Sequence, residues 1–123
     1  MRTTSRLEPN PSQMLKRLLV INPRNRSIKE VDDVDLGSLI DSLLGDTGVN
    51  KLQLDHDNSI WYSDKPVSSR YAWYLEGMAT GEYEVRRYCM GILVGFKEDK
   101  AWDKVTLLDY LRFYDKQNLY GDV

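Results

Sequence analysis

Residues 86–96 read RRYCMGILVGF, and this stretch decides how the rest of the chain is organised. From Cys89 to Phe96 it is the longest nearly charge-free run in the sequence. It is short, rich in branched and aromatic residues, and interrupted by Gly91 and Gly95, which favours a buried strand over a helix. A glycine inside a strand indicates a bulge or the close approach of a neighbour. The sequence therefore predicts that residues 89–96 form the central strand of the fold.

The length and composition are those of one ordinary globular domain. The chain has 123 residues, of which 41% are hydrophobic and 29% are charged. A chain of this size can bury roughly two-thirds of its unfolded surface, enough for a core without disulfide bonds. Residues 1–13 contain Pro9 and Pro11 and show no periodicity, so we expect a flexible N-terminal leader there. Residues 14–123 are expected to form the single domain.

No segment of the sequence is suited to secretion or to a membrane. The first residues lack an apolar stretch, and no run approaches the roughly 20 apolar residues of a transmembrane helix. The single cysteine, Cys89, has no partner for an internal disulfide, which fits a reducing compartment. We therefore expect a cytoplasmic protein with no membrane partner, in which Cys89 is buried rather than reactive.

Charge is distributed unevenly along the chain, whose net charge is −2. Residues 1–29 hold seven basic residues and one acidic residue, whereas residues 30–123 hold ten basic and eighteen acidic residues. Such an asymmetry can mark a basic arm that binds an anionic partner. The simpler interpretation, which we prefer, is a solvated tail followed by the exposed side of a strand. The overall acidic balance argues against broad affinity for nucleic acid.

Two hairpins are predicted from apolar runs separated by turn-forming residues. Residues 14–22 end in an apolar run, the turn at 23–27 contains proline and asparagine, and residues 27–31 mix apolar and charged side chains. Residues 49–54 and 60–62 form the second pair of strands, joined by the turn Asp55-His56-Asp57-Asn58. For residues 70–75, where three aromatic residues cluster, the pattern leaves strand and helix both open.

Two amphipathic helices are predicted. The apolar stripe of the first consists of Leu36, Leu39, Ile40, Leu43 and Leu44. Acidic residues precede it, and Gly45 is well placed to end it. The second helix is expected to begin near Thr106, where Thr106 and Asp109 resemble a capping box, and to end near Asn118. Its apolar stripe consists of Leu107, Leu108, Leu111 and Tyr114.

These elements predict an α+β fold with a single mixed, mostly antiparallel sheet of four to six strands and two amphipathic helices. Their order resembles a family of small domains of uncharacterised function found largely in bacteriophages and prophages. The resembling segments are residues 18–23, residues 28–31, the helix at 36–44, the turn at 54–58, residues 91–96 and the leucine-led helix at 106–114. The similarity covers residues 15–115 in outline. The resemblance implies the outline of the fold and a phage origin for the chain. It also implies that the chain is a small protein that binds and modulates a host factor.

The sequence contains no motif for metal, nucleotide or nucleophilic chemistry, so we predict no cofactor and favour a role without catalysis. The turn at residues 55–58 fails as an EF-hand loop, because Ile60 replaces the glycine and Pro66 replaces the glutamate. One histidine and one cysteine are too few for an ordinary zinc site, and His56 is interpreted as a turn residue. A nucleophile elbow and a phosphate-binding loop are both missing from the sequence. An enzyme that uses dispersed carboxylates is left open.

The candidate binding residues are aromatic rings interleaved with arginines. They are Trp61, Tyr62, Arg70, Tyr71, Trp73, Tyr74, Arg86 and Arg87. Such residues are enriched at protein–protein interfaces, and they also stack bases and bind phosphates. The alternative is a core in which Trp61 and Trp73 pack inward while the arginines face water. If the region is exposed instead, a homodimer is also expected.

Two hypotheses about function follow. The first is a small non-enzymatic, phage-type accessory protein that binds and modulates a host protein. The second is a domain that binds a nucleotide or another small anionic ligand through the arginine and aromatic cluster. The orientation of Trp61, Trp73 and Trp102 is the observation that distinguishes a core from a binding surface.

Overall fold

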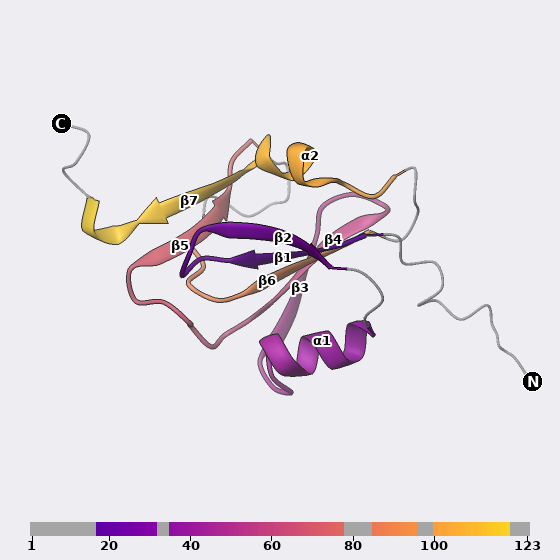
Figure 1. Cartoon of the computed structure of the whole chain (residues 1–123), viewed down its shortest axis with the longest axis horizontal. Coiled ribbons are helices and arrows are strands. Elements are labelled where there is room, and N and C mark those ends of the chain that lie inside the picture. Colours follow the sequence, from indigo (N-terminus) through magenta and orange to yellow (C-terminus); the bar gives the residue numbers. More distant parts are fainter. Residues whose placement is uncertain (1–16, 32–34, 78–84, 96–99, 119–123) are drawn as a thin grey trace, which may run out of the picture.

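A computed structural model describes residues 17–31, 35–77, 85–95 and 100–118 (Figure 1). Over these residues the chain forms seven strands, two α-helices and one 3-10 helix. The strands are β1 (Arg17–Asn22), β2 (Ser27–Val31), β3 (Val49–Gln53), β4 (Asn58–Ser63), β5 (Tyr71–Leu75), β6 (Gly91–Gly95) and β7 (Leu111–Asp115). The helices are α1 (Leu36–Leu43), α2 (Lys104–Leu108) and the 3-10 helix η2 (Lys116–Asn118). The predicted α+β class is confirmed.

Several sequence predictions concern residues outside the described ranges. These are the leader at 1–13, the first residues of the predicted strand at 14–22, part of the acidic segment before the first helix, and residue 96 at the end of the central stretch. Within the described ranges, no helix combines the length and the apolar character needed to cross a membrane.

The larger sheet has five antiparallel strands in the order β2-β1-β6-β4-β3, so β6 lies at its centre (Figure 1). All five residues of β6 are buried. Leu93 lies between Leu19 of β1 and Ile60 of β4, and the three side chains share one core cluster. The predicted central strand is confirmed, because an apolar run without alternation suits a strand that is covered on both faces. Both predicted hairpins are present as the pairs β1–β2 and β3–β4.

The two glycines of β6 allow neighbours to approach the strand closely, as predicted. A Cβ atom at Gly91 would lie 3.1 Å from Cζ2 of Trp73, and one at Gly95 would collide with Ala101. Two segments outside the sheet therefore pack directly against the backbone of its central strand.

The first helix agrees with its prediction. The side chain of Asp35 accepts a hydrogen bond of 2.9 Å from the backbone N–H of Ser38, and Gly45 has a φ angle of +90° just beyond the helix. Aspartate is a favoured N-cap because its carboxylate satisfies a free N–H group, and glycine adopts the left-handed conformation without strain. The apolar side of α1 packs on one face of the five-stranded sheet.

The C-terminal part differs from its prediction. Instead of one helix from 106 to 118, the chain forms the five-residue helix α2, whose N-cap is Asp103 rather than Thr106, followed by strand β7. Leu111 and Phe113 pack in the core, whereas the intervening side chains do not. This period of two suits a strand, and it overrides a leucine pattern that also matches a helix.

Strand β7 pairs with β5 in a second antiparallel sheet of two strands, so the prediction of a single sheet is wrong in this detail. Residues 71–75, for which the sequence left strand and helix open, form strand β5. The physical reason for the second sheet is that the five-stranded sheet is apolar on both faces and each face needs a covering layer. We call strands β5 and β7 together the β5–β7 ribbon.

The described elements form three layers, with the five-stranded sheet in the middle (Figure 1). On one face α1 packs over a cluster that contains Leu18, Ile92 and Val94. On the opposite face the β5–β7 ribbon and α2 pack over a cluster that contains Trp73 and Leu107. Most of the candidate binding residues therefore lie on or beside the ribbon.

Candidate functional site

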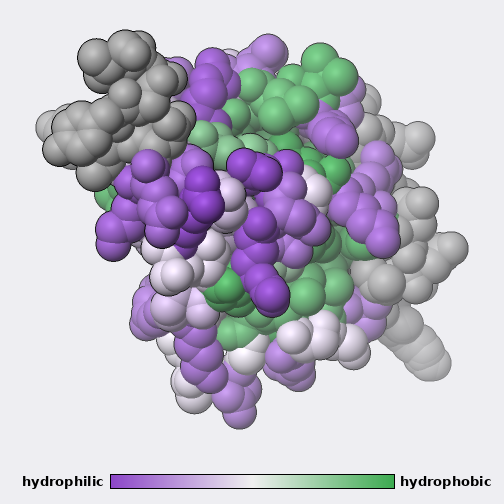
Figure 2. Space-filling model, turned by 60° about the vertical axis from the view of Figure 1, so that its left-hand side comes forward, coloured by the Kyte–Doolittle hydropathy of each residue, from purple (hydrophilic) through white to green (hydrophobic). Residues whose placement is uncertain are grey.

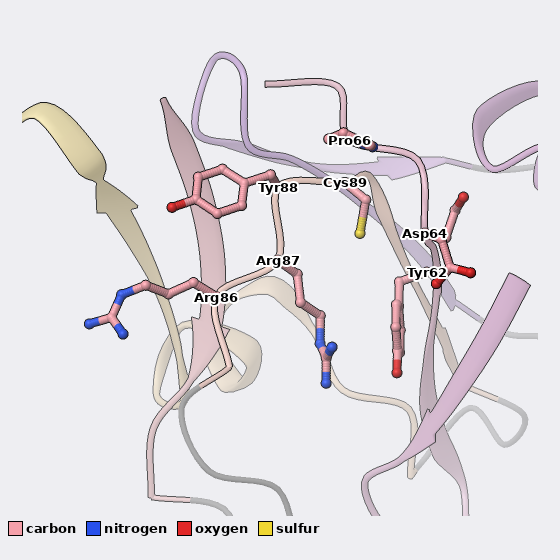
Figure 3. A pocket seen from close by; sticks show the side chains of 8 residues that line it. Tyr62, Asp64, Pro66, Arg86, Arg87, Tyr88 and Cys89 are labelled. Carbon is pink, nitrogen blue, oxygen red and sulfur yellow. The ribbon is translucent and has the colours of Figure 1, made fainter. Parts of the chain in front are cut away.

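The segment that precedes β6 runs beside β5 and determines where its two arginines point. Arg87 and Trp73 exchange two backbone hydrogen bonds of 2.9 Å, in which each N–H donates to the carbonyl oxygen of the other residue. Residues paired in this way have side chains on the same side, and their sequence neighbours lie on the other side. Arg87 therefore shares the inner side of β5 with Trp73, whereas Arg86 and Tyr88 share the outer side with Tyr74. Figure 3 shows Arg86 and Tyr88 directed away from Arg87.

Trp73 belongs to the core rather than to a binding surface. Its side chain is fully buried, and its Nε1 atom donates a hydrogen bond of 2.9 Å to the carbonyl oxygen of Cys89. Its ring meets the ring of Tyr62 edge to face, with the centroids 6.3 Å apart. A buried indole with a satisfied N–H is a structural residue, so the core interpretation is the right one for Trp73.

The outer side of the ribbon holds a guanidinium group against two tyrosine rings. The Cζ atom of Arg86 lies 5.2 Å from the ring centre of Tyr74 in β5 and 4.3 Å from that of Tyr114 in β7. Both distances are within the roughly 6 Å range of a cation–π contact. Arg112 lies on the same side, because it is the partner of Tyr74 in the ladder. We call Tyr74, Arg86, Tyr88, Arg112 and Tyr114 the tyrosine–arginine face.

The carboxylates of the described residues compensate the charges of the tyrosine–arginine face only in part. Arg112 forms an ion pair of 3.2 Å with Glu76 and donates a hydrogen bond of 2.8 Å to the carbonyl oxygen of Leu108. Arg86 is exposed and has no carboxylate partner among the described residues. An arginine that is positioned by rings but not neutralised keeps its donors available for another molecule.

Figure 2 views the molecule from the side on which β5 and β7 lie in Figure 1. Hydrophilic residues predominate on this side, and hydrophobic residues show between them. A surface of this mixed kind suits a partner that is recognised by rings and charges together.

On the inner side, Arg87 lies over the ring of Tyr62, with its Cζ atom 4.2 Å from the ring centre. The two side chains extend side by side at a hollow of about 240 Å³ (Figure 3). The hollow is lined by Tyr62, Ser63, Asp64, Pro66, Arg86, Arg87, Tyr88 and Cys89. It is smaller than the roughly 300–1,000 Å³ of ordinary ligand pockets, so it offers a subsite rather than an enclosed pocket.

Cys89 is buried, as predicted, although it borders this hollow. Burial raises the pKa of its thiol above the ordinary value, and hydrogen bonds and the charge of Arg87 lower it by less. A buried, protonated thiol is a poor nucleophile. Within the part of the chain that the structure describes, no group of three or more histidine, cysteine, aspartate or glutamate side chains could hold a metal ion. His56 is exposed in the turn between β3 and β4.

A third group of predicted residues lies at one end of the ribbon. The Cζ atoms of Arg26 and Arg70 lie 4.4 and 4.9 Å from the ring centre of Tyr71. Arg70 also forms a two-point ion pair with Asp115, with Nε–Oδ1 and Nη2–Oδ2 distances of 2.8 and 3.0 Å. The hydrogen bonds from Arg70 lower the pKa of the Asp115 carboxyl below its usual range. This pair joins β5 to β7, so Arg70 has a structural role.

Trp61 lies apart from the other predicted residues. It is half-buried in the cluster on the α1 side of the sheet, and the Nζ atom of Lys51 lies 5.7 Å from its ring centre. Its neighbour Tyr62 points to the opposite face, as successive residues of a strand do. Trp102 is half-buried and stacks on Tyr110 with the ring centroids 5.2 Å apart. The eight predicted residues therefore comprise three pairs, the core residue Trp73 and the separate Trp61, and they do not form one site.

The sequence interpretation missed Tyr114 and Arg112, because it placed both on a helix. The signal that identifies them is the alternation of apolar and polar side chains over residues 111–114, which has the period of a strand. Arg26 was missed because no local pattern connects the β1–β2 turn to β5.

Comparisons of the chain with protein-family models, with curated proteins and with solved structures give no match. The fold and the site by themselves define the class: an α+β protein whose β5–β7 ribbon carries the tyrosine–arginine face on its outer side. The resemblance to phage-encoded domains stays a prediction.

Proposed function

We propose that this protein binds another protein through the tyrosine–arginine face. The observation that carries the proposal is the position of Arg86 against the rings of Tyr74 and Tyr114. Tyrosine and arginine are among the residues that contribute most to binding at protein–protein interfaces. Here the rings stand on neighbouring strands and the guanidinium rests on both, so little side-chain freedom remains to be lost on binding.

The shape of the site favours a macromolecular partner over a small substrate. Tyr74 and Tyr114 stand on neighbouring strands of a two-stranded ribbon, on the side opposite the core residues Trp73 and Leu111. The hollow beside Tyr62 has a volume of about 240 Å³, below that of ordinary ligand pockets. The buried thiol of Cys89 is not suited to nucleophilic catalysis. These features support a role without catalysis.

The resemblance to phage-encoded domains points to the source of the partner. If the chain has a phage origin, the partner is a protein of the bacterial host, and binding modulates the activity of that protein. A small domain with one organised recognition surface is sufficient for such a role, because binding requires a complementary surface and no active site.

The proposal predicts that partner binding depends on the two tyrosines. Immobilised wild-type protein and the variant Tyr74→Ala/Tyr114→Ala are each exposed to bacterial lysates, and the retained proteins are quantified by mass spectrometry. At least one protein should be retained by the wild type and reduced by about 10-fold or more by the variant, which corresponds to ~1.4 kcal/mol.

Arg24→Ala provides the matched control, because Arg24 is exposed in the β1–β2 turn and lies outside the tyrosine–arginine face. It should retain the same protein as the wild type does. If every retained protein were retained equally by the wild type and by the double tyrosine variant, the proposal would be contradicted, because another surface would then bind them. Circular dichroism of each variant establishes that the fold is intact.

A second candidate function is the binding of a nucleotide or another small anion at the hollow beside Tyr62. The observation that favours it is the contact between Arg87 and the Tyr62 ring, since a ring and a guanidinium together can hold a base and a phosphate. Asp64 lines the same hollow and disfavours an anion there. A nucleotide at 100 times its Kd would stabilise the fold by about 2.7 kcal/mol. An unchanged melting temperature with ATP, GTP, CTP and UTP would eliminate nucleotide binding.

A further inference from the structure

Among the described elements, no strand occupies the outer edge of β7. Within the described ranges, β7 pairs with β5 alone. The N–H of Lys116 donates to the carbonyl oxygen of Arg70, and the N–H of Glu76 donates to that of Tyr110, both at 2.8 Å. Every second residue of β7 therefore bonds toward β5, and the intervening residues direct their N–H and C=O groups to the other edge. Phe113 lies in the middle of that edge, with no partner for these groups among the described residues.

Two acidic side chains on or next to the ribbon are already paired with arginines. Glu76 lies 3.2 Å from Nε of Arg112, and Asp115 lies 2.8 Å from Nε of Arg70. Within the described ranges, these two ion pairs use both carboxylates, so neither carboxylate neutralises the other cations beside the ribbon. Asp109 is the C-cap of α2 and lies before the strand begins.

The remaining cations are close to the open edge. Arg86 reaches across β5, so that its Cζ atom lies 4.3 Å from the ring centre of Tyr114 in β7. Lys116 is exposed and follows β7 directly. Within the described ranges neither cation has a carboxylate partner. A strand added to β7 would therefore meet uncompensated positive charge on the side of the tyrosine–arginine face.

We infer that the partner docks as an extended acidic segment that adds a third strand to β7. The inference rests on the proposed function and specifies the chemistry of the partner. Backbone hydrogen bonds to Phe113 give affinity that does not depend on sequence. Every second side chain of the added strand lies on the side of the tyrosine–arginine face. Aspartate or glutamate at these alternate positions pairs with Arg86 and Lys116.

The inference is tested with random twelve-residue peptides displayed on filamentous phage and selected on the immobilised full-length protein. The selected peptides should be enriched in aspartate and glutamate at alternate positions. A synthetic copy of the strongest peptide should bind the wild type at least 10-fold more tightly than the variant Arg86→Gln/Lys116→Gln. Bound peptide should also slow hydrogen exchange of the Phe113 amide at least 10-fold.

The backbone component is tested on the peptide, so that the fold of the protein is not disturbed. N-methylation of the alternate amides that face β7 should abolish binding, whereas N-methylation of the other amides should leave it within about threefold of the parent peptide. Equal tolerance of both methylation patterns would overturn strand addition.

The outcomes distinguish this inference from the proposed function. Selected peptides could lose binding to the variant Tyr74→Ala/Tyr114→Ala and yet show no acidic enrichment and no slower hydrogen exchange at Phe113. This result would overturn strand addition but would still support protein binding through the tyrosine–arginine face. A selection that yields no peptide dependent on the two tyrosines would contradict both.

Discussion

The inner and outer sides of the β5–β7 ribbon hold their aromatic rings in different ways. On the inner side Trp73 is fully buried, and its N–H group is satisfied by the carbonyl oxygen of Cys89. On the outer side Tyr74, the next residue, is half-buried and lies against the guanidinium of Arg86. Adjacent residues of one strand therefore have a core environment and a surface environment.

This difference shows how one short ribbon can contribute rings to the core with one side and present rings at the surface with the other. The inner rings cover the five-stranded sheet, and removing them opens a cavity. The outer rings contact a charged group and solvent, so they can change with little effect on the free energy of unfolding. Stability measurements on matched positions therefore test whether the two sides are as distinct as the geometry indicates.

The largest effect is expected for Trp73→Ala. The substitution removes a fully buried ring from the core cluster and leaves the Cys89 carbonyl without its donor, so the free energy of unfolding should fall by about 3–5 kcal/mol. Chemical denaturation measures the loss. Tyr74→Ala is the matched control on the same strand and should cost about 1 kcal/mol or less. Similar losses at the two positions would remove the distinction between the sides.

A smaller effect is expected for Gly95→Ala, which tests the packing of the layer that contains the ribbon and α2 against β6. The added methyl group would collide with Ala101, whose Cα atom lies 2.8 Å from the position of the new Cβ. The cost should be about 1–3 kcal/mol, because overpacking forces the backbone to shift. The double variant Gly95→Ala/Ala101→Gly should recover at least half of the loss in a denaturation experiment. No recovery would show that the Cβ atom of Ala101 is not the cause, because glycine at this position removes the Cβ and keeps the Cα.

The smallest effect is expected for Asp55→Asn. Asp55 lies in the turn between β3 and β4 and accepts a hydrogen bond from Trp102, which packs against the core cluster under the ribbon. Partial burial raises the pKa of Asp55, but hydrogen bonds from Asn58, the backbone of Asp57 and Trp102 outweigh it and lower the pKa below its ordinary value of 3.8. The bond from Nε1 of Trp102 is 3.1 Å long. Loss of the charged acceptor should cost about 1 kcal/mol at pH 7.

The pH dependence identifies the carboxylate as the cause. Because the pKa of Asp55 is lower in the folded state, its contribution is present above the unfolded-state value near 3.8 and is lost as the pH falls through the folded-state value. The difference in stability between the wild type and Asp55→Asn should therefore shrink between pH 5 and about pH 2. A difference that stays constant over this range would assign the effect to packing rather than to charge.

Local patterns were sufficient for the first half of the fold. The leucine stripe and the aspartate before it define α1, and turn residues between apolar runs define the hairpins β1–β2 and β3–β4. They were not sufficient for residues 111–115, because the leucines from Leu107 to Leu111 continue a helical spacing into a segment of only five residues. A strand that short contains too few alternations to outweigh the neighbouring helical pattern.

The candidate site was predicted only in composition. The sequence identified rings and arginines, but it could not predict that Arg86 and Arg87 lie on opposite sides of the ribbon. Their directions are set by the pair of backbone hydrogen bonds between Arg87 and Trp73. Neither could it place Tyr114 beside Arg86, since the two residues meet only when β7 pairs with β5. Side-chain direction on a strand follows from register, and register depends on partners that are distant in the sequence.

The sequence by itself determined the buried central strand, because an apolar run with two glycines is stable only between covered faces. It also determined the burial of Cys89 within that run. Tertiary structure alone decided that the apolar face opposite α1 is covered by a second small sheet, and that two tyrosines of this sheet lie against Arg86. The reason is that burial is specified by composition along the chain, whereas the grouping of exposed side chains is specified by strand pairing between distant segments.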